Sequence, residues 1–351
     1  MKYMAQYFVE EFEKKFGGGA VLAINVKEED LLTMDKATRT DKREILKEWS
    51  DLGLKPHGIE TFKIYFPGNQ TPRYSKDVDL SNCEKVTLLT KHIDPESLAG
   101  VIQNISDIGA ELLPSIFRYW KQKEMKENDT LKDFVNYFGD SDKKRTFDTM
   151  NERGEILAPI QLFYSTWNNI LNALNSASEY FDVRGAKELQ ANDILQRGKM
   201  SVIDVTFKHG IGFGAVLLRD LLVKVYQENS IRSEDERIPI LIIIDEVHSF
   251  YSSIRSREAL DILNTICRKG RSLKIGVIFA SQNPEDMPPG INSVVNSKIY
   301  FKSDPKNIRS LGINITGIDT EALKPGYGIA RIHNLSQLKF IKFPMSLAGV
   351  R

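Results

Sequence analysis

Several features that would place the chain in a specialised class are scarce or absent. Only two cysteines, Cys83 and Cys267, occur in 351 residues and they lie far apart, so neither a disulfide framework nor a cysteine-ligated zinc site is expected. No apolar stretch approaches the roughly 18 residues that a membrane span needs, and there is no secretory leader pattern. These absences favour a protein of the reducing cytoplasm that has no membrane partner.

An excess of charge of one sign is also missing. The 48 Lys and Arg residues nearly balance the 47 Asp and Glu residues, and the formal net charge is +1. A nucleic-acid partner would therefore have to contact a local basic patch or the inner surface of an oligomer. With 41% hydrophobic residues, the chain can bury one large core or two smaller ones.

The strongest positive signal is an apolar run, residues 240–244 (ILIII), that ends in Asp245 and Glu246. A continuous run of β-branched residues and leucine is typical of a strand buried on both faces of a parallel sheet. Acidic residues at its carboxyl end lie where open α/β sheets bind ligands. This is the Walker B pattern, in which the first acid helps to hold Mg²⁺ and the second orients the attacking water. The alternative is a solvated turn in which Asp245 caps the next helix.

The companion motif of such a site, the phosphate loop G-x-x-x-x-G-K-[ST], occurs nowhere in the sequence. The chain opens instead with a helix predicted over Met1–Phe16, closed by three glycines, and a buried strand over Ala20–Val26. Because a phosphate loop normally precedes such a helix, we expect either that the loop was removed by truncation or that it was never present. This polypeptide alone should bind ATP weakly and hydrolyse it poorly.

Strands alternate with helices after residue 195, which predicts a parallel, doubly wound sheet. The strands predicted there are Met200–Phe207, Ile238–Asp245, Lys274–Ser281 and Ser297–Lys302, followed by an antiparallel pair, Tyr327–Ile332 and Leu338–Phe343. Earlier, residues 27–58 are helical in composition, Thr61–Phe66 and Lys85–Leu89 are predicted strands, and Ile156–Leu174 is a predicted amphipathic helix. The chain therefore divides into a first part of the core (1–89), a helical insertion (90–185) and a second part of the core (186–351).

Four stretches carry a family resemblance: FGGGAVLAINVKEEDLL (16–32), IIIDEVHSF (242–250), RKGRSLKIGVIFASQNP (268–284) and LKPGYGIARI (323–332). They resemble the HerA family of RecA-like ATPases, relatives of FtsK and of conjugative-secretion motors. The resemblance covers roughly residues 1–35 and 195–345, and it implies an α/β RecA-like P-loop NTPase core with a mainly parallel sheet and a helical insertion. It also implies ATP and Mg²⁺ as cofactors, duplex DNA in the central channel of a homo-hexamer, and a partner nuclease.

The resemblance also implies roles for individual residues. Asp245 would assist Mg²⁺, Glu246 would be the catalytic carboxylate, and Gln282 would sense the γ-phosphate. Arg271, in the family's Gly-Arg position, would act as an arginine finger on the nucleotide of a neighbouring subunit. A surface cation at a helix end is the alternative for Arg271, and Arg268 competes for the finger role.

Three positions depart from the family pattern: Asn25 stands where many members have Asp, Glu28 where many have Gly, and Ser272 where Lys is common. The first two weaken a catalytic role for the loop after the first strand. The segment Lys208–Gly214 (KHGIGFG) is either a mobile pore loop or a strand-to-helix turn. Arg255 and Arg257 either contact phosphates in a channel or belong to a solvated loop.

Three functions remain open. The first is an ATP-dependent DNA translocase or helicase of HerA type, and the second is a non-hydrolysing assembly or scaffold subunit. The third is a conjugation or secretion motor, which the missing membrane span counts against. Because a scaffold has no need for a carboxylate pair facing a crevice, the retained acids favour the first. This interpretation requires Asp245, Glu246 and Gln282 to converge at one rim of the sheet.

Overall fold

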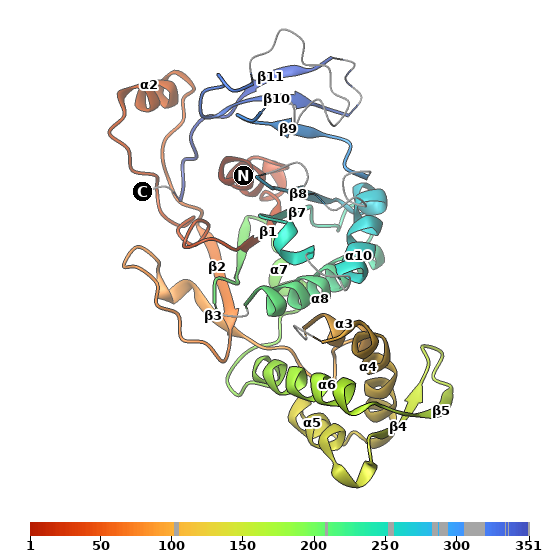
Figure 1. Ribbon diagram of the computed structural model, residues 1–351. Helices are drawn as coiled ribbons and strands as arrows, with labels where there is room; N and C mark the ends of the chain where they lie inside the picture. The colour runs from red at the N-terminus through yellow and green to blue at the C-terminus, as the bar shows by residue number, and fades with distance from the viewer. Residues whose placement is uncertain are drawn as a thin grey trace.

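The computed structural model describes residues 1–101, 105–207, 210–251, 256–282, 287, 294–304, 320–333, 335 and 337–349. Its centre is a six-stranded sheet in the order β3-β2-β6-β1-β7-β8, in which every pairing is parallel (Figure 1). The strands are β1 (Ala20–Asn25), β2 (Thr61–Pro67), β3 (Cys83–Val86), β6 (Lys199–Asp204), β7 (Ile240–Ile244) and β8 (Ile275–Phe279). The predicted parallel α/β sheet is confirmed.

The central strands are buried because both faces of the sheet are covered. Every residue of β1, β6 and β7 is buried, as expected for continuous apolar runs in a parallel sheet. Alternate residues of β1 enter two separate cores: Leu22 packs in the one that includes α8 (Gly210–Ile231) and α10 (Ser256–Lys269), and Val21 in the one that includes α1 (Lys2–Glu10). Helices therefore lie on opposite sides of the sheet (Figure 1).

The first helix is shorter than predicted. It ends at Glu10, not at Phe16, and only a 3-10 turn, η1 (Lys14–Phe16), follows. The chain then reverses through Gly17 and Gly18, both at positive φ, to lay β1 beneath the helix. A Cβ on Gly18 would lie 1.7 Å from the Val9 carbonyl oxygen. The close approach of helix and turn thus requires glycine there.

The segment between β1 and β2 contains less helix than its composition predicts. Only α2 (Arg43–Asp51) is helical. Leu31, Leu32 and Met34, which lie before it in irregular structure, are buried against the α1 side of the sheet. Burial of these apolar side chains has prevailed over the helical propensity of the charged residues around them.

A largely helical module follows β3. Its helices are α3 (Pro95–Val101), α4 (Asp107–Tyr119), the π-helical turn η3 (Trp120–Glu124), α5 (Leu131–Gly139) and α6 (Tyr164–Ala177). The short helix α7 (Ala191–Ile194) follows the module. Its buried residues, among them Phe117 and Phe134, form one continuous cluster with α8 and with Leu22 of the sheet. The module therefore packs on the core instead of enclosing a separate interior.

The module also contains a β-hairpin that was not predicted. Strands β4 (Thr146–Met150) and β5 (Ile156–Gln161) pair antiparallel, so the single helix predicted over Ile156–Leu174 is wrong for its first part. Pro159 in the middle of that part disfavours a helix, and Gly154 turns the chain at φ +79° just before it. The apolar spacing of this segment fitted a helix, and the pairing with β4 decides for a strand.

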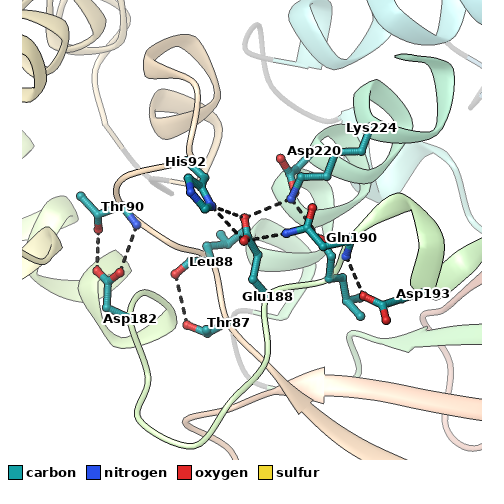
Figure 2. A network of polar contacts seen from close by, with 11 residues as sticks. Thr87, Leu88, Thr90, His92, Asp182, Glu188, Gln190, Asp193, Asp220 and Lys224 are labelled. Carbon is teal, nitrogen blue, oxygen red and sulfur yellow. Dashed lines mark hydrogen bonds and ion pairs between the residues drawn. The ribbon is translucent and has the colours of Figure 1, made fainter. Parts of the chain in front are cut away.

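A network of charged and polar side chains fixes the junction between module and core (Figure 2). The Asp182 carboxylate accepts hydrogen bonds from the Thr90 amide (3.1 Å) and hydroxyl (2.6 Å), which joins the returning chain to the departing one. Lys224 of α8 contacts Glu188 at 3.1 Å and Asp220 at 2.7 Å. Burial raises the pKa of Asp220, and Lys224 opposes that rise. The returning segment is thereby tied to α8.

The last strands form a separate antiparallel sheet in the order β11-β10-β9. The predicted pair of β10 (Tyr327–Arg331) and β11 (Lys339–Lys342) is confirmed. Strand β9 (Lys298–Tyr300), expected in the parallel sheet, pairs instead with β10. The remaining short helices are η2 (Leu80–Asn82), η4 (Ser141–Lys143), η5 (Ser178–Tyr180), α9 (His248–Tyr251) and η6 (Gly270–Leu273). Over the residues that the structure describes, no helix has both the length and the hydrophobicity to cross a bilayer.

Candidate active site

The residues predicted to converge do meet at the carboxyl edge of the sheet. Asp245 and Glu246 directly follow β7, and Gln282 follows the neighbouring strand β8. Backbone pairing continues past the strands, because the Ala280 amide donates to the Ile244 carbonyl at 2.9 Å. The Gln282 side-chain amide Nε2 donates to Glu246 Oε1 at 2.8 Å. The two strand ends therefore carry one connected polar cluster.

Glu246 has an unusual backbone conformation and is buried. Its φ is +44°, in the left-handed region that residues other than glycine seldom adopt, and its side chain is only 7% exposed. Its amide donates to Asp245 Oδ1 at 3.0 Å, which stabilises the turn. Strained backbone conformations cluster at active sites and ligand clamps, so this buried carboxylate is a candidate functional residue.

Two further groups face the Glu246 carboxylate. The Lys27 ammonium, from the loop after β1, contacts Oε1, the oxygen that also accepts from Gln282. His248 Nδ1 lies 3.3 Å from Oε2. The hydrogen bond to Glu246 raises the pKa of Lys27. Sequence reasoning missed Lys27, although its place two residues after the end of β1, the strand beside β7, was a usable signal.

Asp245 is half-buried beside this cluster. Burial raises the pKa of Asp245, while the hydrogen bond from the Glu246 amide opposes that rise. Among the described residues, no group of three or more His, Cys, Asp or Glu side chains is arranged to hold a metal ion by itself. A single carboxylate fits Mg²⁺, which is commonly bound through one or two carboxylates together with phosphate and water oxygens.

Arg271 lies away from this cluster. It belongs to η6, which precedes β8, so it is at the amino edge of the sheet, whereas Gln282 follows β8 at the carboxyl edge. A five-residue strand separates the two edges by about 16 Å. There Arg271 lines a surface pocket of about 650 Å³ together with Arg268 and Lys269. The structure therefore does not bring Arg271 to Glu246 of the same chain.

Comparison with known proteins gives partial matches to one group of enzymes. No family model matches the chain. It is similar to the DNA double-strand break repair helicase HerA of Saccharolobus solfataricus, at 25% identity over 178 residues that cover 49% of this chain and 31% of the relative. HerA of Sulfurisphaera tokodaii is 26% identical over 196 residues, 52% of this chain and 39% of the relative. The chain thus spans less than two fifths of the length of these curated relatives.

Solved structures match over most of the chain at low identity. VirB4 of Thermoanaerobacter pseudethanolicus aligns over 94% of this chain and 83% of its own, with a TM-score of 0.51 and 13% identity. The plasmid coupling protein TrwB, in complex with a non-hydrolysable ATP analogue, aligns over 95% and 87%, with a TM-score of 0.53 and 12% identity. These likenesses show the RecA-like P-loop ATPase fold. The chain is HerA-like.

Two departures of this HerA-like chain from the family pattern now have a structural account. Asn25, buried at the end of β1, donates to the Glu28 carbonyl (2.8 Å) and to Asp204 Oδ1 (3.0 Å), and accepts from the Leu31 amide (3.1 Å). Its role is to hold the loop. Glu28 has φ +39°, a conformation that glycine, the residue expected there, adopts without penalty.

A third acid at the same edge of the HerA-like chain was not predicted. Asp204, which ends β6, is fully buried and accepts from Tyr74 OH at 2.7 Å. Burial and the nearby Asp204 carboxylate raise the pKa of Tyr74 well above its ordinary value. An acid at the end of an apolar strand was the available signal. Because its hydrogen bonds hold neighbouring loops, Asp204 is a structural residue of the rim.

Beside this rim the loops line an open cavity of about 710 Å³. Its lining includes Lys2, Glu28, Glu29, Asp30, Arg73 and Tyr74. Residues 28–30 belong to the loop that also carries Lys27, so one loop connects the cavity with the Glu246 cluster. Of the positions compared with the family pattern, Glu28 lies in the lining of this cavity, whereas Asp245, Glu246 and Gln282 do not.

Other predicted contacts are only partly covered by the structure. Lys208, His209 and Arg255 lie outside the described residues, and Arg257 is described only in its backbone. Residues 210–214, however, form the first turn of α8. A Cβ on Gly210 would lie 2.4 Å from the Val205 carbonyl oxygen. For these five residues the structure favours the strand-to-helix turn over a free loop.

Proposed function

We propose that the chain is the hydrolytic part of an ATP-driven DNA translocase of HerA type. The observation that carries the proposal is the Glu246 carboxylate, buried at φ +44° and bonded to Gln282 on the adjacent strand end. Residues in such conformations cost on the order of 1–3 kcal/mol. The burial of a carboxylate in that conformation, bonded across two strand ends at the ligand-binding edge of the sheet, supports a chemical role over that of an assembly subunit.

The residues divide the chemistry among them. The Asp245 carboxylate would hold Mg²⁺, which, when bound, neutralises charge on the phosphates. Glu246 would accept a hydrogen bond from the attacking water and orient it. Gln282 donates to Glu246 from the end of the next strand. In this proposal its side-chain amide would link the position of the Glu246 carboxylate to the presence of the γ-phosphate. Asp245 and Glu246 are the Walker B pair in this proposal.

Hydrolysis needs two groups that this chain does not place at Glu246. The pattern G-x-x-x-x-G-K-[ST] does not occur in the 351 residues, and in this proposal another segment or another polypeptide supplies the phosphate-binding loop. Arg271, at the opposite edge of the sheet, could act only on the site of a neighbouring copy. The proposal therefore includes a ring, a homo-hexamer by analogy with the resemblance, in which assembly completes each site.

The DNA substrate is supported by the name of the curated relatives, DNA double-strand break repair helicases. Duplex DNA in a central channel and a partner nuclease follow from the same analogy. The net charge of +1 requires that contacts with DNA be local and repeated by the copies in the ring. A scaffold subunit and a secretion motor are the outcomes against which this proposal is tested.

The test compares wild type with Glu246→Gln in the complete gene product, assayed for hydrolysis of Mg-ATP with and without duplex DNA. We expect the substitution to lower kcat by about 10²–10⁴-fold, the contribution typical of a positioned general base, while equilibrium binding of nucleotide is retained. Glu44→Gln, which changes an exposed glutamate of α2 in the same way, is the matched control and should leave kcat unchanged.

Three results would contradict the proposal. Wild type that hydrolyses no ATP with DNA present would favour the scaffold. Hydrolysis that survives Glu246→Gln would remove the base from the mechanism. Wild-type hydrolysis that responds to an extended protein substrate and not to DNA would favour the secretion motor.

A further inference from the structure

The most heavily engaged oxygen of the site is Glu246 Oε1. It receives both the Lys27 ammonium and the Gln282 amide. A carboxylate oxygen has about two lone-pair positions for hydrogen bonds, so both are occupied. Oε2 lies on the side of His248, 3.3 Å from Nδ1. In this arrangement Glu246 has little capacity left on Oε1 to accept a proton of water.

Lys27 is the partner of Glu246 that can leave most easily. Its side chain is 45% exposed, against 7% for Glu246, and its long flexible stem lets the ammonium move without disturbing the sheet. Gln282, in contrast, follows a strand whose pairing continues to Ala280. Release of Lys27 would free one position on Oε1 and leave the carboxylate aligned by Gln282.

The loop that carries Lys27 is held by contacts around the 710 Å³ cavity. Glu29 accepts from the Ser75 hydroxyl at 2.6 Å, and Asp30 pairs with the Lys2 ammonium at 3.3 Å. These four residues all line the cavity. A ligand that enters the cavity would compete for the same contacts and shift the loop.

We infer that Lys27 is a positioning residue that restrains Glu246 in the resting site, and that displacement of the residue 26–30 loop releases the carboxylate. This inference rests on the proposed function, since it assigns a means of control to the same site. It connects the cavity to hydrolysis: a ligand bound at residues 28–30 would determine whether the Lys27 ammonium stays bonded to Glu246 Oε1.

The kinetic test uses Lys27→Met and Lys27→Arg in the complete gene product. A half-exposed ion pair limits the effect, so we expect Lys27→Met to raise the DNA-independent kcat by about fivefold, which corresponds to about 1 kcal/mol. The KM for ATP and the DNA-stimulated kcat should stay close to wild type, so that the stimulation ratio falls. Lys27→Arg, which keeps the cation, should restore the ratio, and Lys47→Met, which changes an exposed lysine of α2, should have no effect.

A second test needs neither nucleotide nor hydrolysis. In the nucleotide-free chain, Lys27→Met should shift Tm by about 1–2 °C in the wild-type background and by clearly less in the Glu246→Gln background, because the pair is already broken there. Equal shifts in both backgrounds would show that Lys27 and Glu246 are not coupled and would overturn the inference.

The outcomes separate this inference from the proposed function. If wild type hydrolyses ATP and Lys27→Met leaves the basal kcat unchanged, the restraint is wrong and the hydrolytic function stands. If Lys27→Met abolishes hydrolysis as Glu246→Gln does, Lys27 is required for the chemistry and does not restrain it. If neither wild type nor Lys27→Met hydrolyses ATP, both proposals fail.

Discussion

At the scale of single residues, two glutamates at the carboxyl edge occupy conformations that suit glycine. Glu246 has φ +44° and Glu28 has φ +39°. The two differ in their surroundings, because Glu246 is buried with three polar groups around it and Glu28 is exposed. Strain at Glu246 is offset by a bonded carboxylate, whereas within the described part of the chain the Glu28 side chain makes no hydrogen bond or ion pair that would do the same. The sequence departs from the family's glycine at a cost that can be measured.

Replacement of Glu28 tests that cost. The left-handed conformation disfavours any residue with a Cβ by about 1 kcal/mol or more, so Glu28→Gly should be about 1 kcal/mol more stable than Glu28→Ala. Urea unfolding of both variants measures the difference. At Glu111, an exposed residue within α4, the order should reverse, because glycine in a helix is about 1 kcal/mol worse than alanine. The same order at both positions would show that Glu28 is not strained.

At the scale of elements, the contact between α1 and β1 depends on the turn that joins them. Gly19 N donates to the Phe8 carbonyl at 2.9 Å, which places the turn directly under the last residues of the helix. Gly18 lies at φ +79° with no room for a side chain. The helix that covers one face of the sheet is thus positioned by backbone contacts as well as by its apolar side chains.

Gly18→Ala should be strongly destabilising. The added methyl would meet the Val9 carbonyl, 1.7 Å from its ideal position, and the residue would also keep an unfavourable φ. We expect a loss of about 2–4 kcal/mol in the free energy of unfolding. Gly53→Ala is the matched control, because Gly53 has φ +68° and no atom within 4 Å of the added Cβ. It should cost only about 1 kcal/mol, and equal losses at both sites would exclude the clash.

The elements that were predicted correctly are those whose local pattern and tertiary role agree. The run before Asp245 is apolar throughout and is buried throughout in β7. Both the assignment of this run as a buried strand and the position of Asp245 and Glu246 at its end therefore followed from the sequence. Residues 156–161 were misassigned because their partner strand, β4, has no strong pattern of its own. Lys27 was missed because its contact with Glu246 joins positions 219 residues apart, which spacing along the chain cannot show.

At the scale of the whole molecule, a carboxylate that the candidate site needs lowers the stability of the fold. Asp245 sits half-buried beside Glu246, and burial raises its pKa above the ordinary value of 3.8. A carboxyl group with a raised pKa stabilises the fold fully only below its unfolded pKa, and that contribution is lost as pH rises through the folded pKa. Near neutral pH the ionised Asp245 is therefore a net cost to the folded chain.

Asp245→Asn should reveal this cost through its pH dependence. The variant cannot ionise, so its free energy of unfolding should exceed that of wild type at about pH 7, and the gain should shrink as pH falls toward about 4. Urea unfolding at both pH values measures the two differences. A gain that is the same at both pH values would show that ionisation of Asp245 is not its source.

The single apolar cluster shared by module and core has a further consequence. Phe117 and Phe134 of the module belong to the same cluster as Leu217 and Leu221 of α8, and Figure 1 shows the module against that helix. Excising residues 95–177 would leave a long apolar stripe of α8 open to water. The module therefore cannot be moved to another protein as an independent unit. During divergence only its outward surface is free to change, while substitutions on its inner side must be matched by substitutions in α8.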